Sequence, residues 1–558
     1  MAKTVIIGGV AGGASCAARL RRLDEEREIV VLERGPYVSY ANCGLPYHVG
    51  GVIPNREALI VQTPQVLRTR FNLDVRVRHE VTAINRGEKT VTVRDLGNGR
   101  EYRESYDTLV IATGSSPVRP PIPGIDSPRI RTVWSVPDVD AIRELMGREQ
   151  ITSAAVIGGG FIGLEMADNL HHAGVEVTII EALDQVMAPL DYEMALLLHE
   201  NIRKNGVALH LGDPVESFTE RDGVVTVALK SGAKVGAQLV ILAIGVRANN
   251  ALAKAAGLAL NERGGVVVDE HLRTSDPAIY AVGDVIEIRD FVFDDRAMIP
   301  LAGPANKQGR IAADNIAGLS SIYMGTQGTS VAKIFSLTAA STGAAEKTLV
   351  HRGLRRGRDY ETVTISQNSH ATYYPGAAPM MLKLVFSRDG RKIFGAQIVG
   401  QDLVDKRIDT IATVLRLGGG VRELAGLELA YAPPYSSAKD PVNMLGFVAE
   451  NLLAGRVSIA EWNEPDTNRE AVFLDVREKP EHEAYRAPGS TLLPLSELRA
   501  RIGELDPKKR HIILCGMGVR AYVAQCILAQ HGFGNLAIYP GGMRFYRSTH
   551  NPLATAMA

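Results

Sequence analysis

Residues 156–165 read "VIGGGFIGLE", an apolar strand that enters a glycine-rich turn and continues as a helix. Gly158, Gly160 and Gly163 occupy the three positions of a GxGxxG pattern, which permits a tight turn and lets backbone N–H groups approach a pyrophosphate. Glu181 closes the next strand, where a carboxylate accepts hydrogen bonds from a ribose 2′-hydroxyl and repels a 2′-phosphate. The segment predicts a Rossmann-like unit that prefers NADH to NADPH.

A second glycine loop, "IIGGVAGGAS" at residues 6–15, is less regular. Gly8 and Gly13 fit the first and third glycine positions, but Val10 occupies the middle one. Glu33 lies 20 residues beyond Gly13, at the spacing of an acidic residue that closes the next strand. One such loop is compatible with an ordinary strand–turn–helix, but two in one chain predict two dinucleotide-binding units.

Length and charge limit the other possibilities. The chain has 558 residues, of which 46% are hydrophobic, enough for about three or four domains. Its 62 Lys+Arg balance 62 Asp+Glu, so no net field attracts nucleic acid or an anionic membrane. The sequence has neither a signal-peptide pattern nor an apolar run near the ~20 residues that span a bilayer. We expect a cytoplasmic protein without nucleic-acid or membrane partners.

The four cysteines, Cys16, Cys43, Cys515 and Cys526, form no CxxC pair and have no zinc-like spacing. We therefore expect no metal site and no disulfide framework. Cys43 lies in "SYANCGLPY" (39–47), a polar, turn-like setting that favours a reactive thiol over a buried small hydrophobe. Cys16 and Cys526 fall within expected helices and are interpreted as packing residues.

The segment "TSDPAIYAVGDV" (274–285) resembles the FAD-ribityl segment of the flavoprotein oxidoreductases with two dinucleotide-binding domains. This resemblance implies that the first glycine loop binds FAD and the second binds NADH. It implies FAD contacts from Gly8, Gly9, Ala11, Gly12, Gly13, Glu33, Arg34, Ala112, Thr113, Gly114 and Asp284.

The stretch around Cys43 looks like that of the coenzyme A disulfide reductases, flavoproteins with a single redox cysteine, and the resemblance extends to about residue 450. The CxxxxC pair of the glutathione-reductase type is absent, and "LAYAPPYSSAKDP" (429–441) replaces the His–Glu pair of those enzymes. The resemblance implies that NADH reduces FAD and that reduced FAD cleaves a mixed disulfide between Cys43 and the substrate.

Arg19 and Arg22 are three residues apart and share one helix face, which by itself fits a nucleotide groove or a solvated basic face equally well. The resemblance favours the groove and implies bound coenzyme A, as cofactor or substrate. Its implied coenzyme A contacts are Ser15, Arg19, Arg22, Ser39, Asn42 and Lys439. It also implies a homodimer in which Tyr373 and Tyr431 reach the active site of the partner subunit.

The C-terminal part contains a strand, "AVFLDVRE" (471–478), and a strand–loop–helix, "HIILCGMGVRAYVAQCIL" (511–528). The loop from Cys515 to Arg520 leads into a helix, so its N–H groups form a nest that favours a thiolate or persulfide anion. With the "YPGGMRFY" ending (539–546), this part is similar to rhodanese sulfurtransferases. The similarity implies that Cys515 carries sulfane sulfur with Arg520 assisting; a domain used only for docking is the alternative.

The expected fold class is α/β, with two Rossmann-like dinucleotide-binding domains, an α+β dimerisation domain and a C-terminal α/β rhodanese-like domain. The boundaries that we expect are 1–118 and 247–322 for the FAD-binding domain, 119–246 for the NADH-binding domain, 323–450 for the dimerisation domain, 451–467 for a linker and 468–558 for the rhodanese-like domain.

These features together predict a flavoprotein that uses NADH to reduce sulfur–sulfur bonds in coenzyme A persulfide, polysulfide or coenzyme A disulfide. Cys515 would deliver sulfane sulfur, and sulfide would be released at Cys43. An NADH oxidase or peroxidase with a sulfenic-acid Cys43 is the competing enzyme. Such relatives carry a histidine in the first glycine loop, where this chain reads Val10–Ala11–Gly12–Gly13, and this disfavours the oxidase.

Overall fold

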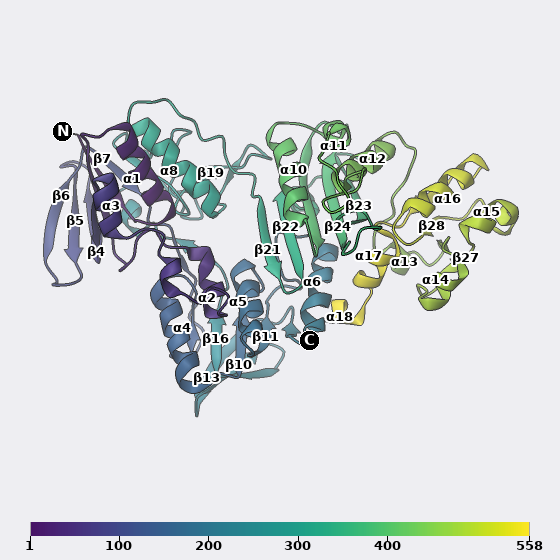
Figure 1. Cartoon of the computed structure of the whole chain (residues 1–558), viewed down its shortest axis with the longest axis horizontal. Helices are drawn as coiled ribbons and strands as arrows, with labels where there is room; N and C mark the ends of the chain where they lie inside the picture. Colours follow the sequence, from purple (N-terminus) through teal and green to yellow (C-terminus); the bar gives the residue numbers. More distant parts are fainter. Residues whose placement is uncertain (1, 557–558) are drawn as a thin grey trace. The chain divides into compact units, whose positions relative to one another are not determined.

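The computed structural model describes residues 2–556. The chain forms two compact units (Figure 1). The first contains the residues up to Ile180 together with Pro214–Gly328, and the second contains Glu181–Asp213 and the residues from Thr329 onward. Each unit is described separately below.

A five-stranded parallel sheet begins the first unit, and its order places the N-terminal strand in the middle. Its strands are apolar and almost continuously buried, as expected where helices cover both faces of a parallel sheet. In spatial order they are β18 (Ile279–Ala281), β7 (Thr108–Ile111), β1 (Lys3–Ile7), β2 (Glu28–Glu33) and β3 (Asp74–Val77).

Helices α1 (Ala11–Leu23) and α8 (Ala302–Ile316) pack on this sheet and against each other (Figure 1). They approach closely because glycine lies at the crossing: a Cβ atom on Gly309 would be 2.3 Å from the carbonyl oxygen of Gly12. A small antiparallel sheet of β4 (His79–Asn85), β5 (Thr90–Asp95) and β6 (Glu101–Ser105) is inserted between β3 and β7.

The second parallel arrangement in this unit has β10 (Ser153–Ile157) between β11 (Glu176–Ile180) and β16 (Leu239–Leu242), with β9 (Ile130–Arg131) beside β16. Helix α5 (Phe161–His172) connects β10 to β11. An antiparallel meander precedes β16; its strands are β13 (Val215–Arg221), β14 (Val224–Leu229) and β15 (Lys234–Ala237). The two strand–glycine turn–helix units predicted from the sequence are both present.

An antiparallel sheet forms the centre of the second unit. Its order is β21 (Ser330–Ile334), β22 (Leu337–Gly343), β25 (Ile393–Gly400), β24 (Pro379–Ser387) and β23 (Tyr360–Asn368). The helices that contact it include α6 (Tyr192–Lys204), α10 (Val404–Arg416) and α12 (Pro441–Leu453). Sheet and helices together form the α+β arrangement expected for residues 323–450.

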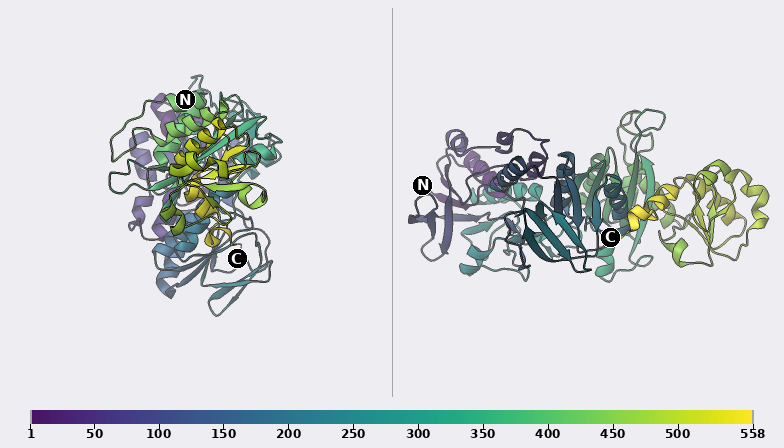
Figure 2. Two further views of the ribbon diagram at one scale, coloured as in Figure 1. Left: turned by 90° about the vertical axis from the view of Figure 1, so that its right-hand side faces the viewer. Right: turned by 90° about the horizontal axis from the view of Figure 1, so that it is seen from below.

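The C-terminal part is a small α/β fold around a four-stranded parallel sheet, shown at the yellow end of the colour scale in Figure 2. Its strands are β27 (Thr491–Leu492), β26 (Val472–Asp475), β28 (His511–Leu514) and β29 (Leu536–Ile538). Helices α14 (Lys479–Ala484), α15 (Leu495–Arg501), α16 (Val519–Gln530) and α17 (Gly542–Thr549) accompany them.

The expected linker at residues 451–467 is largely folded. Helix α12 continues to Leu453, Val457 joins the C-terminal hydrophobic core, and Ile459 pairs with Ile538 next to β29. A short helix, α13 (Glu464–Thr467), follows. The polar composition suggested a free connection, but three apolar side chains in this stretch, Val457, Ile459 and Ala460, give it a buried side.

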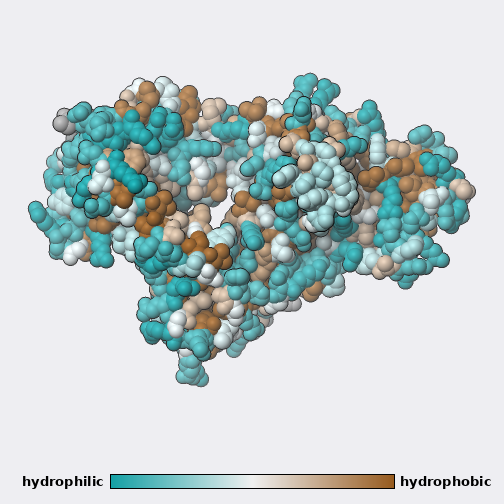
Figure 3. Space-filling view, in the orientation of Figure 1, coloured by the Kyte–Doolittle hydropathy of each residue, from teal (hydrophilic) through white to brown (hydrophobic). Residues whose placement is uncertain are grey.

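Hydrophilic side chains cover much of the visible surface, with apolar patches scattered among them (Figure 3). Among residues 2–556, no helix is both long enough and apolar enough to cross a membrane.

Candidate functional site

The first glycine turn lies at the carboxyl edge of the first sheet. β1, β7 and β18 are parallel neighbours, so Gly8, Ala112 and Val282, the residues that directly follow them, lie side by side. A Cβ atom on Gly8 would be 2.2 Å from the Ala112 carbonyl oxygen, and one on Gly13 would be 1.9 Å from the Gly8 carbonyl oxygen. These contacts explain why two of the loop's positions require glycine.

Polar groups predicted to hold FAD gather at the same edge. Asp284 accepts a hydrogen bond of 2.7 Å from Ser115, and burial raises the pKa of its carboxyl. Glu33 accepts hydrogen bonds from the backbone N–H groups of Gly9 (2.9 Å) and Gly35 (2.7 Å). The glycine turn, the loop at Ala112–Gly114 and the buried carboxyl fit a dinucleotide such as FAD at the carboxyl ends of the strands.

The second glycine turn has the same construction. Gly158 follows β10, and a Cβ atom there would be 2.4 Å from the Ala243 carbonyl oxygen; one on Gly163 would be 1.9 Å from the Gly158 carbonyl oxygen. Gly160, in contrast, faces open space, with no atom within 4 Å of a Cβ placed there. That opening leaves room for the close approach of a pyrophosphate. In the second unit, Glu181 accepts a hydrogen bond from the Leu183 N–H at 2.8 Å.

Cys43 lies in a short 3-10 turn, η1 (Asn42–Gly44), immediately before helix α2 (Leu45–Val49). Its side chain is exposed, as the polar composition of the segment predicted. Helix α2 packs against α5, the helix that follows the second glycine turn. Cys43 therefore lies in the first unit near the start of α5. Cys16, in contrast, is buried in the core beneath α1, and burial raises the pKa of its thiol to about 12.

Tyr47 on α2 and Glu165 on α5 interact electrostatically with the Cys43 thiol. Tyr47 donates a hydrogen bond of 3.2 Å to Glu165. Partial desolvation and the charge of Glu165 raise the pKa of the Cys43 thiol. Burial raises the pKa of the Glu165 carboxyl in turn, although the hydrogen bond from Tyr47 opposes this. The thiol is thus held toward its protonated form first by desolvation and then by the charge of Glu165.

A groove of about 330 Å³ lies against helices α1 and α8. Four of the six residues expected to contact coenzyme A line it, namely Ser15, Arg19, Arg22 and Ser39. Ser39, which lines the groove, is four residues before Cys43 in the chain. Asn42 lies beside Cys43 in η1, and Lys439 is an exposed residue of the second unit.

The groove combines positive charge with an aromatic ring. Arg22 lies over the Phe71 ring, with 5.9 Å between its guanidinium carbon and the ring centroid. Arg19 is less available, because it donates a hydrogen bond of 2.7 Å to Asp314. Arg310, on α8, adds a further cation to the lining. Such a groove suits a ligand that carries phosphates together with an apolar or aromatic part.

Tyr373 and Tyr431, the two tyrosines expected to reach the partner's active site, contact each other in the second unit. Their hydroxyl groups are 2.6 Å apart, and the side chains of Tyr373 and Tyr431 are both exposed. The loop that carries Tyr431 is anchored by a buried salt bridge of 3.0 Å between Arg407 and Asp440. The pair is therefore held in place while its hydroxyl groups face outward.

Cys515 begins the loop between β28 and α16 and is almost fully buried, at 2% exposure. The backbone N–H of Gly518 donates to its sulfur at 3.1 Å, as expected for a loop that surrounds an anion. Arg520 does not face the sulfur freely. It donates two hydrogen bonds, of 2.5 and 2.7 Å, to the carboxylate of Glu481.

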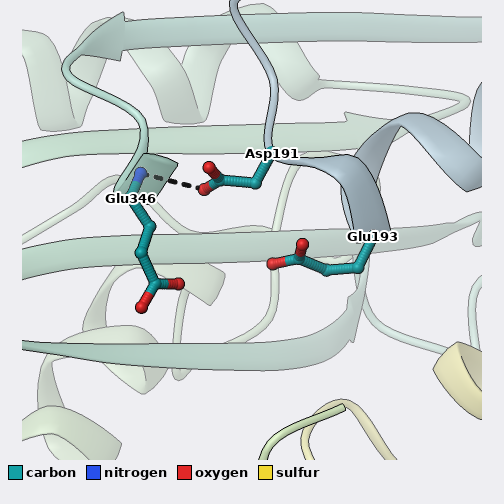
Figure 4. Close-up of side chains that lie close together, drawn as sticks. All are labelled: Asp191, Glu193 and Glu346. Atoms are coloured by element: carbon teal, nitrogen blue, oxygen red, sulfur yellow. Dashed lines mark hydrogen bonds between the residues drawn. The ribbon is translucent and has the colours of Figure 1, made fainter. Parts of the chain in front are cut away.

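Three carboxylates in the second unit, those of Asp191, Glu193 and Glu346, converge as a metal site would require (Figure 4). The ammonium group of Lys383 lies 2.8, 2.5 and 2.7 Å from them, respectively. Burial opposes the charge of Lys383, but the three carboxylates outweigh it and raise its pKa. The cation of this cluster is therefore a lysine ammonium, which joins α6 to β24 and α9 (Glu346–His351).

Several residues of these sites were not predicted from the sequence: Tyr47, Phe71, Glu165, Asn306, Arg310 and Glu481. Glu165 belongs to the glycine-loop segment itself, and Tyr47 to the segment around Cys43. The sequence segments quoted for the second glycine loop and for Cys43 therefore include Glu165 and Tyr47. The other four residues lie outside every quoted segment.

Comparison with known families agrees with these features. Residues 2–309 match the family described as pyridine nucleotide-disulphide oxidoreductase, and residues 329–441 match its dimerisation domain. Residues 459–549 match the rhodanese-like domain. The expected fold class, with two nucleotide-binding parts, a dimerisation domain and a C-terminal rhodanese-like domain, is confirmed.

Individual relatives resemble most or all of the chain. Coenzyme A disulfide reductase of Staphylococcus epidermidis is 35% identical over 451 residues, which cover 81% of this chain and all of the relative. The crystal structure of reduced Bacillus anthracis CoADR-RHD superposes with a TM-score of 0.95 at 48% identity and 98% coverage of both chains. An NAD-dependent persulfide reductase from A. fulgidus has a TM-score of 0.92 at 38% identity, covering 98% of this chain and 100% of its own.

Proposed function

The chain belongs to the pyridine nucleotide-disulphide oxidoreductase family, and on that premise we propose that it uses NADH to reduce coenzyme A persulfide or coenzyme A disulfide at Cys43. It is an FAD- and NAD(H)-linked enzyme that reduces sulfur–sulfur bonds. The choice of substrate and the roles of individual residues are our proposal. The observation that carries it is an exposed single thiol four residues beyond Ser39, which lines a groove with three arginines.

In the proposed reaction, the Cys43 thiolate attacks the inner sulfur of a coenzyme A persulfide. A Cys43–coenzyme A disulfide forms, the persulfide bond breaks, and hydrosulfide leaves with the electron pair. The first glycine turn and Asp284 would hold FAD, which would supply the electron pair of NADH for cleavage of this mixed disulfide. Cys43 would then return to a thiolate, and coenzyme A would leave as a thiol. Overall, the persulfide, NADH and one proton give coenzyme A, hydrogen sulfide and NAD⁺. Coenzyme A disulfide follows the same steps and gives two thiols.

The chain's own residues position the reactants in this scheme. Arg22 and Arg310 bind the phosphates of coenzyme A, and Phe71 contributes an apolar surface to the groove. Ser15, Ser39 and Asn42 hydrogen-bond the arm that leads to the thiol, and Lys439 adds a cation. In a homodimer, Tyr373 and Tyr431 of the second copy lie at Cys43 and protonate the leaving thiolate or sulfide.

Cys515 supplies the sulfur in the same proposal. Its thiolate accepts a sulfane sulfur as a persulfide within the nest of loop N–H groups and passes it to coenzyme A. The competing view is a rhodanese-like domain that serves only for docking. In that case, replacing Cys515 by serine would leave sulfide production from a low-molecular-weight persulfide in the presence of coenzyme A unchanged.

Anaerobic NADH oxidation by the FAD-loaded enzyme tests the proposal, with coenzyme A persulfide and coenzyme A disulfide compared and released sulfide quantified. We expect one sulfide per NADH with the persulfide, abolished in Cys43→Ser and retained in the control Cys526→Ser. Rapid oxygen consumption under NADH without any sulfur substrate would instead favour the oxidase.

A further inference from the structure

The entrance to the Cys515 loop has an unusual charge arrangement. Among residues 515–520, Arg520 is the one charged side chain; the others are glycine, methionine and valine. Val519 is 63% exposed, so an apolar side chain forms part of the rim. A sulfur donor that approaches Cys515 therefore meets an apolar surface and a single guanidinium group.

That guanidinium group is already neutralised. Both of its terminal nitrogens hydrogen-bond the two carboxylate oxygens of Glu481, on α14, in the bidentate geometry that binds Arg to a carboxylate most strongly. The hydrogen bonds from Arg520 lower the pKa of Glu481 to about 2, so the carboxylate remains charged at every physiological pH. The pair presents no net charge to an incoming donor.

A glycine next to Cys515 permits this arrangement. A Cβ atom on Gly516 would be 3.3 Å from Nη2 of Arg520, so the guanidinium lies directly over this position. With a larger residue at position 516, the Arg520 guanidinium would have to shift by a few tenths of an ångström. Gly516 and Glu481 therefore act together: one provides the space and the other the counter-charge.

The other cations near the loop are also engaged. Arg477 is buried and donates to Asp475 at 2.7 Å, and His482 contacts the same carboxylate at 3.0 Å. Arg544, whose N–H donates to the Gly516 carbonyl oxygen, directs its guanidinium to Asn368 on β23. Arg544 keeps its charge, because Asn368 is a neutral amide, but this hydrogen bond directs its guanidinium to β23; the cation that lies over the loop is therefore Arg520.

We infer that this site takes sulfur from an organic persulfide and discriminates against thiosulfate, and that Glu481 sets this preference by occupying Arg520. The inference rests on the proposed role of Cys515 as a sulfur carrier. Thiosulfate is a dianion whose leaving group, sulfite, is also a dianion, so its transfer requires an unpaired cation at the loop. The sulfur atom of an organic persulfide departs as a thiolate with a single charge, and the carbon atoms bonded to it fit the apolar rim at Val519.

The transfer step is the same for both donors. The Cys515 thiolate attacks the outer, sulfane sulfur; a Cys515–sulfur bond forms, the donor's sulfur–sulfur bond breaks, and the donor's remaining part leaves with the electron pair. No external oxidant or reductant is needed, because the sulfane sulfur keeps its oxidation state. The two donors differ only in the charge on the group that leaves, which is sulfite from thiosulfate and a thiolate from the persulfide.

The experiment follows persulfide formation on Cys515 by peptide mass spectrometry in the full-length, FAD-loaded enzyme, with glutathione persulfide or thiosulfate as donor. The wild type should react at least about tenfold faster with the persulfide. Glu481→Gln should raise the thiosulfate rate by about tenfold and change the persulfide rate little. Glu481→Asp should retain the wild-type preference, and Glu483→Gln, an exposed residue of the same helix, is the matched control.

A double variant, Glu481→Gln with Arg520→Gln, should lose the gain with thiosulfate, because the released cation is then absent. Equal rates with both donors in the wild type, or a thiosulfate rate unchanged in folded Glu481→Gln, would overturn the inference. NADH turnover with coenzyme A disulfide reports that each variant is folded. Absence of labelling by either donor would contradict the sulfur-carrier role itself, whereas labelling by thiosulfate with intact sulfide release would contradict only the preference.

Discussion

Tyr47 donates a hydrogen bond of 3.2 Å to Glu165, and this contact joins the helix after Cys43 to the helix after the second glycine turn. The two residues lie 118 positions apart in the chain. The contact places a carboxylate with a raised pKa next to the Cys43 thiol, which we propose reduces the substrate. It therefore connects the acid–base behaviour of Cys43 to the nucleotide-binding helix.

Replacing Glu165 by glutamine should make Cys43 more reactive at neutral pH. Partial desolvation and the Glu165 charge raise the pKa of the thiol, so removing the charge lowers that pKa and increases the thiolate fraction. The rate of Cys43 alkylation against pH, followed by peptide mass spectrometry, measures the effect; we expect its midpoint to move to lower pH. Glu176→Gln, an exposed residue at the start of β11, should leave the profile unchanged.

Loss of a groove arginine should weaken coenzyme A binding without altering the chemistry at Cys43. Arg22→Gln or Arg310→Gln should raise KM for coenzyme A disulfide by about tenfold and leave kcat nearly constant. Arg19→Gln should have a smaller effect, because Asp314 already partners this guanidinium. Arg70→Gln, on an exposed part of α3 (Pro64–Phe71), is the control. Equal KM values in all four variants would remove the groove from the binding site.

Glu181, the acidic residue that follows β11, should control the choice between NADH and NADPH. Glu181→Ala removes a negative charge that repels a 2′-phosphate, so the ratio of kcat/KM for NADH to that for NADPH should fall by about tenfold or more. Glu176→Ala provides a control of the same type. An unchanged ratio would show that other residues set the preference.

Lys383 should be essential for the stability of the second unit. Lys383→Met leaves the buried carboxylates of Asp191 and Glu193 and the half-buried one of Glu346 without the ammonium that contacts all three, and loss of one partner in a buried ionic cluster costs about 3–5 kcal/mol. Denaturant unfolding would measure the loss, with Lys333→Met, an exposed residue of β21, as the control.

The folding stability of Lys383→Met should increase as the pH falls. Without Lys383, burial raises the pKa of the Glu193 carboxyl further and moves the pKa of the Asp191 carboxyl upward. A group with a raised folded-state pKa contributes stability at low pH and loses it as pH rises. The variant should therefore recover part of its stability as pH falls below neutral; a further loss in acid would contradict this account of the cluster.

Much of the fold could be predicted, and candidate reactive cysteines could be selected, because local sequence determines these features. Gly8 and Gly158 have φ angles of +102° and +106°, which only glycine adopts readily, so the two nucleotide turns leave a visible pattern. Cys43 and Cys515 lie in short segments with characteristic neighbours. Each of these features depends on residues within a few positions of one another.

The remaining features arise from contacts between distant segments. Ser15 meets Asn306 across 291 positions, and Lys383 meets Glu193 across 190. Arg520 is visible in the sequence as a loop cation, but its neutralisation by Glu481, 39 positions earlier, is not. A single sequence carries no pattern that pairs such residues, because their approach is decided by the packing of whole elements.

The central claim, that Cys43 forms a disulfide with coenzyme A during turnover, is tested most directly by trapping that intermediate. The dithionite-reduced enzyme is freed of dithionite and mixed without NADH with an excess of coenzyme A disulfide, so that the flavin is reoxidised before the adduct accumulates; it is then quenched with an alkylating agent and digested for mass spectrometry. The account predicts a coenzyme A adduct on the Cys43 peptide, absent in Cys43→Ser and reduced in Arg22→Gln. An unmodified Cys43 in enzyme that has consumed the disulfide, or an adduct on another cysteine instead, would contradict it.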